Sequence, residues 1–181
     1  MMKVGILLAL LLAVAVSRQT YAVLVAGSNG YYNYRHQADV FHAYQVLTDR
    51  GIPHENIITM AYDDIPTDQR NPFPGKVYNK PTYSEPGVDV YNGVQIDYKG
   101  ADVTPANFLA VLRGDKEAAG GKKVLEAGKN DNVFVFFSDH GAPGIMAFPR
   151  GSLHVGDLQT CFEDIEGKYN KFVFYLEVVF S

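Results

Sequence analysis

Runs of consecutive apolar residues constrain the fold of this chain more than any other feature. Residues 21–26 read YAVLVA, residues 133–137 read VFVFF and residues 172–176 read FVFYL. A strand with one face in water alternates apolar and polar side chains, whereas a strand that is covered on both faces does not. Covered strands belong to mainly parallel sheets with helices on their faces. The sequence therefore predicts an α/β fold with a mainly parallel sheet.

The segments between these runs predict the remaining elements. Apolar residues recur with helical spacing in residues 36–50 and 156–165. Thr104 is expected to cap the start of a further helix. Residues 56–62 predict another strand, and residues 138–152 predict a loop. Residues 63–103 are rich in Pro, Gly, Asp and Asn, and loops of this length inside a domain are usually functional.

The first 17 residues differ in kind from the rest. A short positive lead precedes an apolar stretch, and Ala15 and Ser17 form a small-residue cleavage signature before Arg18. This pattern predicts a secretory signal peptide over residues 1–17, one domain over residues 18–181 and no membrane contact after cleavage. The net charge is −4 with scattered basic residues, so a nucleic-acid partner is not expected.

A polar cluster, Ser138-Asp139-His140-Gly141, follows the buried run at 133–137. Sites in parallel sheets form beyond the carboxyl ends of the strands. His140 is therefore either a catalytic base or a histidine that caps the strand with its ring bonded to backbone. The contiguous serine, aspartate and histidine cannot form a serine triad, because neighbouring residues on an extended chain point in opposite directions.

Neither the histidines nor the cysteine predicts a metal site. No two of the five histidines show the spacing H-x₃-H, and we expect no metal and no other cofactor. Cys161 is the single cysteine of the chain, so an internal disulfide cannot form. Cys161 falls at helical spacing with Leu158, Phe162 and Ile165, which predicts a buried, unreactive thiol.

Four longer stretches carry a resemblance to a known family. They are VLVAGSNGYYNYRHQADVFHAYQVL (23–47), GIPHENIITMAYDDI (51–65), RNPFPGKVYN (70–79) and VFVFFSDHGAPGIMAFP (133–149). They resemble the legumain family of cysteine peptidases, the asparaginyl endopeptidases also called hemoglobinases. A related transamidase subunit that attaches lipid anchors shares N-Y-R-H and D-H-G, but it is less similar in the loop 63–79. The resemblance implies a caspase-like fold and cleavage of peptide or protein substrates after asparagine.

The resemblance also implies catalytic roles. His140 would be the general base and acid, Asn33 would orient it, and the backbone N–H of Gly141 would donate to the oxyanion. The family's cysteine nucleophile lies in Y-[IL]-E-A-C-E-S, whereas residues 175–181 here read YLEVVFS. Val179 occupies the nucleophile position and has no lone pair to offer. The chain as written is therefore expected to be inactive.

Further residues are assigned to the substrate pocket by the same resemblance. Arg35, His36 and Glu177 would line the pocket for the asparagine side chain, an amide that needs both donors and acceptors. The alternative for Arg35 is an ion pair with a surface carboxylate. The tripeptide Arg113-Gly114-Asp115 is explained by a helix end rather than by integrin binding.

Two functional hypotheses remain open. In the first, the chain is an N-terminal part of a legumain-type peptidase in the secretory pathway, extracellular or endolysosomal. Its sheet would stop after about the fourth strand, without the C-terminal part and prodomain, and residues 172–176 would form an exposed apolar edge. In the second, it is a secreted inactive homologue or splice product that binds substrate or an intact partner.

Overall fold

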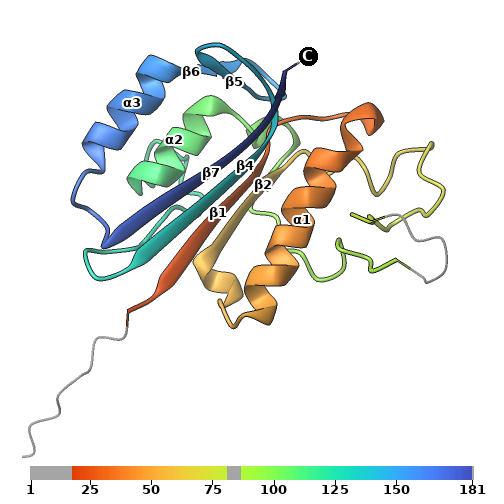
Figure 1. Ribbon diagram of the computed structural model, residues 1–181, viewed down its shortest axis with the longest axis horizontal. Coiled ribbons are helices and arrows are strands. Elements are labelled where there is room, and N and C mark those ends of the chain that lie inside the picture. The colour runs from red at the N-terminus through yellow and green to blue at the C-terminus, as the bar shows by residue number, and fades with distance from the viewer. Residues whose placement is uncertain (1–17, 81–86, 181) are drawn as a thin grey trace, which may run out of the picture.

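The computed structural model describes residues 18–80 and 87–180, and a curled sheet forms its centre (Figure 1). The expected signal peptide, residues 1–17, lies outside the described residues. Strand β4 lies between β1 and β7, and β2 and then β3 continue the sheet beyond β1. These pairs are all parallel. The parallel strands are β1 (Thr20–Ala26), β2 (Ile57–Ala61), β3 (Tyr98–Lys99), β4 (Asn132–Ala142) and β7 (Lys171–Phe180).

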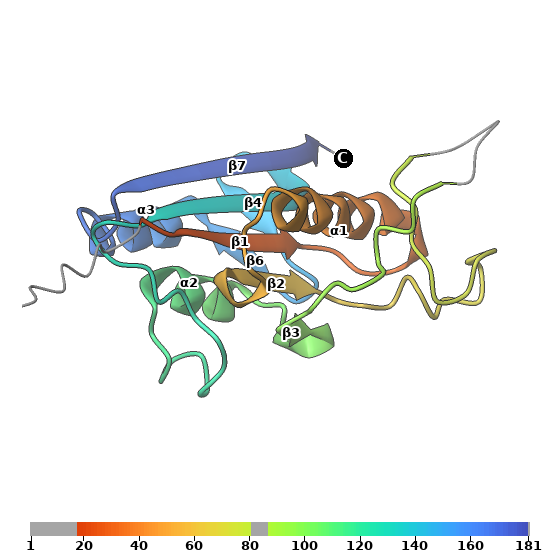
Figure 2. The ribbon, with the colours of Figure 1, turned by 90° about the horizontal axis from the view of Figure 1, so that it is seen from below.

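Helices cover the two faces of the sheet, as Figure 2 shows from below. The side chains of Ala22 and Leu24 in β1 pack into a cluster with helix α1 (Tyr34–Asp49). The alternate residues Val23 and Val25 pack into a second cluster with α2 (Pro105–Arg113) and α3 (Val155–Asp164). The predicted α/β fold with a mainly parallel, helix-flanked sheet is confirmed. Short 3₁₀ turns η1 (Tyr31–Asn33), η2 (His54–Asn56) and η3 (Gly100–Asp102) complete the described elements.

Helix α2 shows how the local sequence sets a helix boundary. The Thr104 side chain accepts a hydrogen bond from the backbone N–H of Asn107, as predicted for an N-cap. Gly114 closes the helix in the left-handed region with φ of 67°, a conformation that favours glycine. Arg113 forms an ion pair with Asp164, with 2.7 Å between Nε and Oδ2. The Arg-Gly-Asp tripeptide is thus a helix end, as expected.

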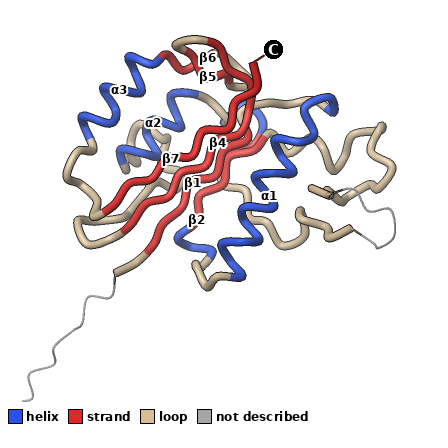
Figure 3. Tube along the Cα trace, viewed as in Figure 1, coloured by secondary structure: helices blue, strands red, loops and turns tan. Residues whose placement is uncertain are grey.

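The predicted loop over residues 138–152 is wrong. Strand β4 continues through the polar cluster to Ala142, because residues 138–141 pair with residues 177–180 of β7. An antiparallel extension follows, formed by β5 (Ile145–Ala147) and β6 (Ser152–His154). The polar residues 138–140 interrupt the apolar run in the sequence, but strand β4 continues through them. Figure 3 shows β5 and β6 as short red strands, joined by tan turns, near the carboxyl end of β4.

Strand β7 departs from the expectation that every apolar run is covered on both faces. Among the described residues, β7 pairs only with β4. Phe172 and Phe174 pack against Phe162 of α3, whereas Val173 and Tyr175 are 42% and 62% exposed. The run therefore has one covered face and one open face, and it forms the exposed apolar edge that the sequence predicted.

Within the described ranges, no helix combines the length and the apolar character needed to cross a bilayer.

Gly27 generates the first prediction, because it lies where β1 ends against β4. A Cβ atom at this position would lie 2.7 Å from Asp139 Oδ2 and 2.8 Å from the carbonyl oxygen of Ala147. The carbonyl belongs to backbone and cannot swing away. We expect Gly27→Ala to lower the free energy of unfolding by about 1–3 kcal/mol, the usual cost of overpacking.

The matched control is Gly156→Ala in α3, where an added Cβ meets no atom within 4 Å. Alanine is a better helix former than glycine, so this variant should be neutral or stabilising. Urea denaturation followed by circular dichroism measures both. Equal stability of Gly27→Ala and the parent chain would contradict the close approach at this position.

Candidate active site

His140 and Asn33 meet where strands β1 and β4 end. Asn33 closes the 3₁₀ turn that follows β1, and His140 lies near the carboxyl end of β4. Parallel pairing of β1 with β4 brings these two ends to the same edge of the sheet. The Nε2 atom of His140 lies 2.8 Å from Oδ1 of Asn33. Two residues 107 positions apart are thereby joined by a direct side-chain hydrogen bond.

The contacts of Asn33 determine which nitrogen of His140 carries the proton. The Asn33 amide nitrogen donates to the carbonyl oxygen of Asn29 at 2.9 Å. A carbonyl oxygen only accepts, so the amide oxygen of Asn33 must face His140 and accept from its Nε2–H. In the neutral ring, Nδ1 then holds the lone pair. This Nδ1 atom is buried and has no hydrogen-bond partner in the described structure.

This geometry bears on the two interpretations of His140. Its ring is held by a side-chain amide, and no hydrogen bond to backbone is present among the described residues. An imidazole fixed at Nε2 with an available lone pair at Nδ1 is the arrangement that a general base needs. The side chain is also partly accessible.

A second histidine lies directly against the first. The His36 and His140 rings meet edge to face, with centroids 4.9 Å apart and planes at 84°. His36 is 2% exposed, so it is buried behind His140 rather than at an open surface. Its Nδ1 atom lies 2.7 Å from Ser28 Oγ and 3.3 Å from Asp139 Oδ1.

The serine, histidine and aspartate of this buried cluster are not a proton relay. Ser28 and Asp139 both approach the same nitrogen of His36, whereas a relay requires one partner on each nitrogen. Ser138 is fully buried, which agrees with its exclusion as a nucleophile. The contacts of Ser28 and Asp139 with His36 were missed by sequence reasoning, because no spacing along the chain signals side chains that converge from three segments.

The other expected pocket residues, Arg35 and Glu177, are both exposed. Arg35 donates from Nη1 to the carbonyl oxygen of Tyr32 at 3.4 Å, and Glu177 lies in β7 opposite Ser138. No hydrogen bond or ion pair within residues 18–80 and 87–180 joins either side chain to His140. The alternative for Arg35, an ion pair with a surface carboxylate, is also absent from these ranges.

Strand register places the expected nucleophile position beside the histidine. Val179 of β7 pairs with His140 of β4, and Phe180 pairs with Gly141. Gly141 also pairs with Met146 of β5, so it has neighbours on both sides. A Cβ at Gly141 would lie 3.3 Å from both the carbonyl oxygen of Ile145 and the Val178 side chain. A side chain would therefore crowd this position.

Cys161 does not supply an alternative nucleophile. Its side chain is fully buried in the core on α3, as predicted. Burial raises the pKa of the thiol above its usual range, and Arg113 opposes this shift only in part. A raised pKa reduces the fraction of reactive thiolate at neutral pH.

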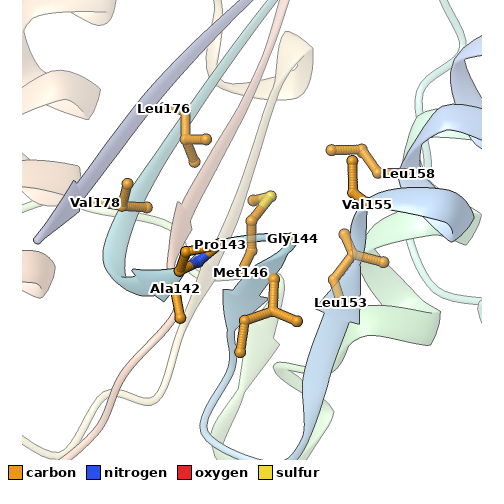
Figure 4. Close-up of a pocket in the computed structure, with 10 residues that line it drawn as sticks. Ala142, Pro143, Gly144, Met146, Leu153, Val155, Leu158, Leu176 and Val178 are labelled. Atoms are coloured by element: carbon orange, nitrogen blue, oxygen red, sulfur yellow. The ribbon is translucent and has the colours of Figure 1, made fainter. Parts of the chain in front are cut away.

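Figure 4 shows an apolar groove that the sequence did not predict. One of its lining residues, Ala142, follows His140 by two positions in the sequence. The groove has a volume of about 420 Å³ and lies between β7 and the β5–β6 extension. Its walls include Ala142, Met146, Leu153, Leu158 and Leu176. These five residues come from β4, β5, β6, α3 and β7, so no sequence pattern marks them as one surface.

The fold and the polar edge of the sheet define the class of this protein as an α/β domain with a histidine-centred site. The Peptidase C13 family model matches residues 20–181, and the chain belongs to this family. It is 57% identical to legumain from Rattus norvegicus over 162 residues, covering 87% of this chain and 36% of the relative.

Two further relatives show how widely the similarity extends. Hemoglobinase from Schistosoma japonicum is 53% identical over 162 residues, covering 88% of this chain and 37% of the relative. The vacuolar-processing enzyme of Vicia sativa is 49% identical over 162 residues, covering 87% of this chain and 32% of the relative. The chain thus spans about a third of the length of these curated relatives.

The tautomer of His140 is directly measurable. We expect ¹⁵N NMR of the neutral ring to show protonation at Nε2 and a free Nδ1, because Asn33 accepts from Nε2. In Asn33→Ala this preference should be lost, while the exposed His42 keeps the same spectrum in both proteins. A predominant Nδ1–H tautomer in the parent chain would show that the assigned hydrogen bond is wrong.

Burial of Cys161 predicts slow thiol chemistry. At neutral pH, iodoacetamide should modify the folded chain far more slowly than the urea-unfolded chain, because the raised pKa leaves little thiolate and the side chain is covered. The rate should rise with pH as the thiol ionises. Intact mass spectrometry measures it, and equal rates in folded and unfolded protein would contradict the buried assignment.

Proposed function

We propose that this chain carries the histidine half of a legumain-type cysteine peptidase site, with the nucleophile position filled by valine. His140 is the general base and acid, and Asn33 orients it. The observation that carries the proposal is the His140–Asn33 hydrogen bond, which leaves Nδ1 available one strand away from Val179. Neighbouring strands lie about 4.8 Å apart, so a cysteine side chain at position 179 would start close to the His140 ring.

The chemistry explains why the residue type at position 179 decides activity. A cysteine thiol gives its proton to the histidine and attacks the peptide carbonyl, and the histidine then returns a proton to the leaving amine. The backbone N–H of Gly141 donates to the oxyanion in this scheme. Valine offers no lone pair for the attack. The chain as written therefore does not hydrolyse peptides by this route.

The proposed substrate is a peptide or protein with asparagine before the cleaved bond. Arg35 and Glu177 are exposed and carry the donor and the acceptor that a carboxamide needs. His36 is buried, so in this proposal it supports the pocket through its contact with the His140 ring. The similarity to proteins named legumain and hemoglobinase supports peptide or protein substrates.

The proposed location is the secretory pathway, either extracellular or endolysosomal. The signal-peptide pattern of residues 1–17 supports entry into the pathway. The name of the Vicia sativa relative, vacuolar-processing enzyme, refers to a vacuole and supports the endolysosomal alternative.

A second candidate function is binding without catalysis. Strand β7 exposes Val173, Tyr175 and Leu176, at 42%, 62% and 47%. An apolar strand edge of this kind pairs readily with another chain. An inactive homologue or splice product could use it to bind substrate or an intact partner. A dose-dependent change in the hydrolysis catalysed by an intact legumain, on addition of this chain, favours this candidate.

The test of catalysis compares three proteins: the chain as written, Val179→Cys, and Val179→Cys with His140→Ala. Each is incubated with an Ala-Ala-Asn reporter and with an Ala-Ala-Asn peptide bearing a thiol-reactive end. We expect no reaction from the chain as written. Val179→Cys should become labelled at residue 179, and loss of His140 should slow this labelling by about 10²–10⁴-fold, the usual contribution of a general base.

Matched controls separate chemistry from folding. Val179→Ala should remain unlabelled, and circular dichroism should be the same for all variants. Hydrolysis by the chain as written that disappears in His140→Ala would overturn the predicted inactivity. Labelling of Val179→Cys that does not depend on His140 would overturn the assigned base.

A further inference from the structure

We propose that His36, Asp139 and His140 form a binding site for a divalent cation of the zinc class. One ligand atom from each of these three residues lies within 4.8 Å of the others. They come from two elements, α1 and β4, which the fold brings together. The absence of a histidine spacing motif led the sequence analysis to expect no metal, but spacing detects only ligands that share an element.

Unpartnered donor atoms provide an independent observation. His36 Nε2, Asp139 Oδ1 and His140 Nδ1 are buried and have no hydrogen-bond partner in the described structure. His36 and Asp139 are each only 2% exposed. Burying a polar atom without a partner is costly, and such atoms usually have a functional reason. A bound cation would satisfy all three residues at once.

The surrounding hydrogen bonds prepare the ligands. Asn33 accepts from Nε2 of His140 and so directs its Nδ1 lone pair away from the amide. Metal-binding histidines commonly have their second nitrogen held by such a partner, which fixes the ring and its tautomer. For His36, Nε2 has no partner and is the available ligand atom, whereas Nδ1 already lies 2.7 Å from Ser28 Oγ and 3.3 Å from Asp139 Oδ1.

The donor set indicates the kind of cation. Two imidazoles and one carboxylate suit zinc and cobalt, whereas calcium and magnesium prefer oxygen donors alone. Ligand atoms around one tetrahedral zinc ion lie roughly 3.3 Å apart, given bond lengths near 2.1 Å. The ligand atoms of the three residues lie within 4.8 Å of one another, so small side-chain movements would bring them to this separation. His140 is partly exposed and can make the remaining movement.

Binding would also have a consequence for the proposed chemistry. A cation on Nδ1 of His140 occupies the lone pair that the proposed function assigns to proton transfer. This consequence rests on the proposed function, but the metal site itself does not. Cation binding is measurable on the chain that carries Val179, without any catalytic readout, so failure of either proposal leaves the other standing.

The experiment titrates the chelator-treated, full chain with Co²⁺ followed by visible absorption, and with Zn²⁺ followed by calorimetry. We expect one equivalent of each ion and the intense visible bands of tetrahedral cobalt. His140→Gln removes a ligand and should weaken binding by more than about 100-fold, whereas Asn33→Ala removes only its support and should weaken it about 10–100-fold. Asp139→Asn, which keeps the shape of the side chain, should also weaken binding.

The matched controls are His42→Gln and His154→Gln, which change exposed histidines outside the cluster and should leave binding unchanged. Circular dichroism verifies that each variant is folded. We replace His140 because it is partly exposed, whereas replacing the buried His36 could unfold the chain. Absence of saturable binding by the parent chain would overturn the proposal. So would affinity that is the same in His140→Gln and Asp139→Asn as in the parent, or that falls in either control.

Discussion

The parallel pairing of β4 with β1 on one side and β7 on the other is the constraint on which the rest of the structure depends. Backbone hydrogen bonds along an eleven-residue strand fix its register against both neighbours. Because all three strands run in the same direction, their carboxyl ends meet at one edge. Asn33 follows β1, His140 lies near the end of β4, and residue 179 lies in β7. A shift of one residue in register would reverse the face that each side chain occupies.

The same pairing forces polar side chains into a buried setting. Asp139 and His36 lie at the boundary between the apolar core and the edge of the sheet, each almost fully covered. In such surroundings hydrogen bonds are strong and missing partners are expensive. Gly27 makes this packing possible, because any side chain there would meet the Asp139 carboxylate. The absence of a side chain at Gly27, directly after β1, therefore leaves the space that the buried Asp139 side chain occupies.

Much of the fold was predictable from sequence, and the failures have physical causes. Apolar runs identified β1 and the cores of β4 and β7, and Thr104 marked the start of α2. The extension of β4 through Asp139 was missed because polar residues can continue a strand when a neighbouring strand supplies pairing, as β7 does for residues 138–141. The position of His140 at a strand end was predictable, whereas its contact with the buried His36 depends on how α1 packs on β4.

Within the described residues, the histidine arrangement is built without any side chain of β7. The hydrogen bonds of His140, Asn33 and His36 all lie within residues that follow β1 or belong to β4 and α1. None of them involves β7, which pairs only with β4 within the described ranges. In the proposed function, a change of residue type at position 179 therefore removes the attacking atom and leaves the histidine geometry in place. The remaining side chains, His36, Asp139 and His140, place their lone pairs close together. A set of lone pairs of this kind can bind a proton or a cation.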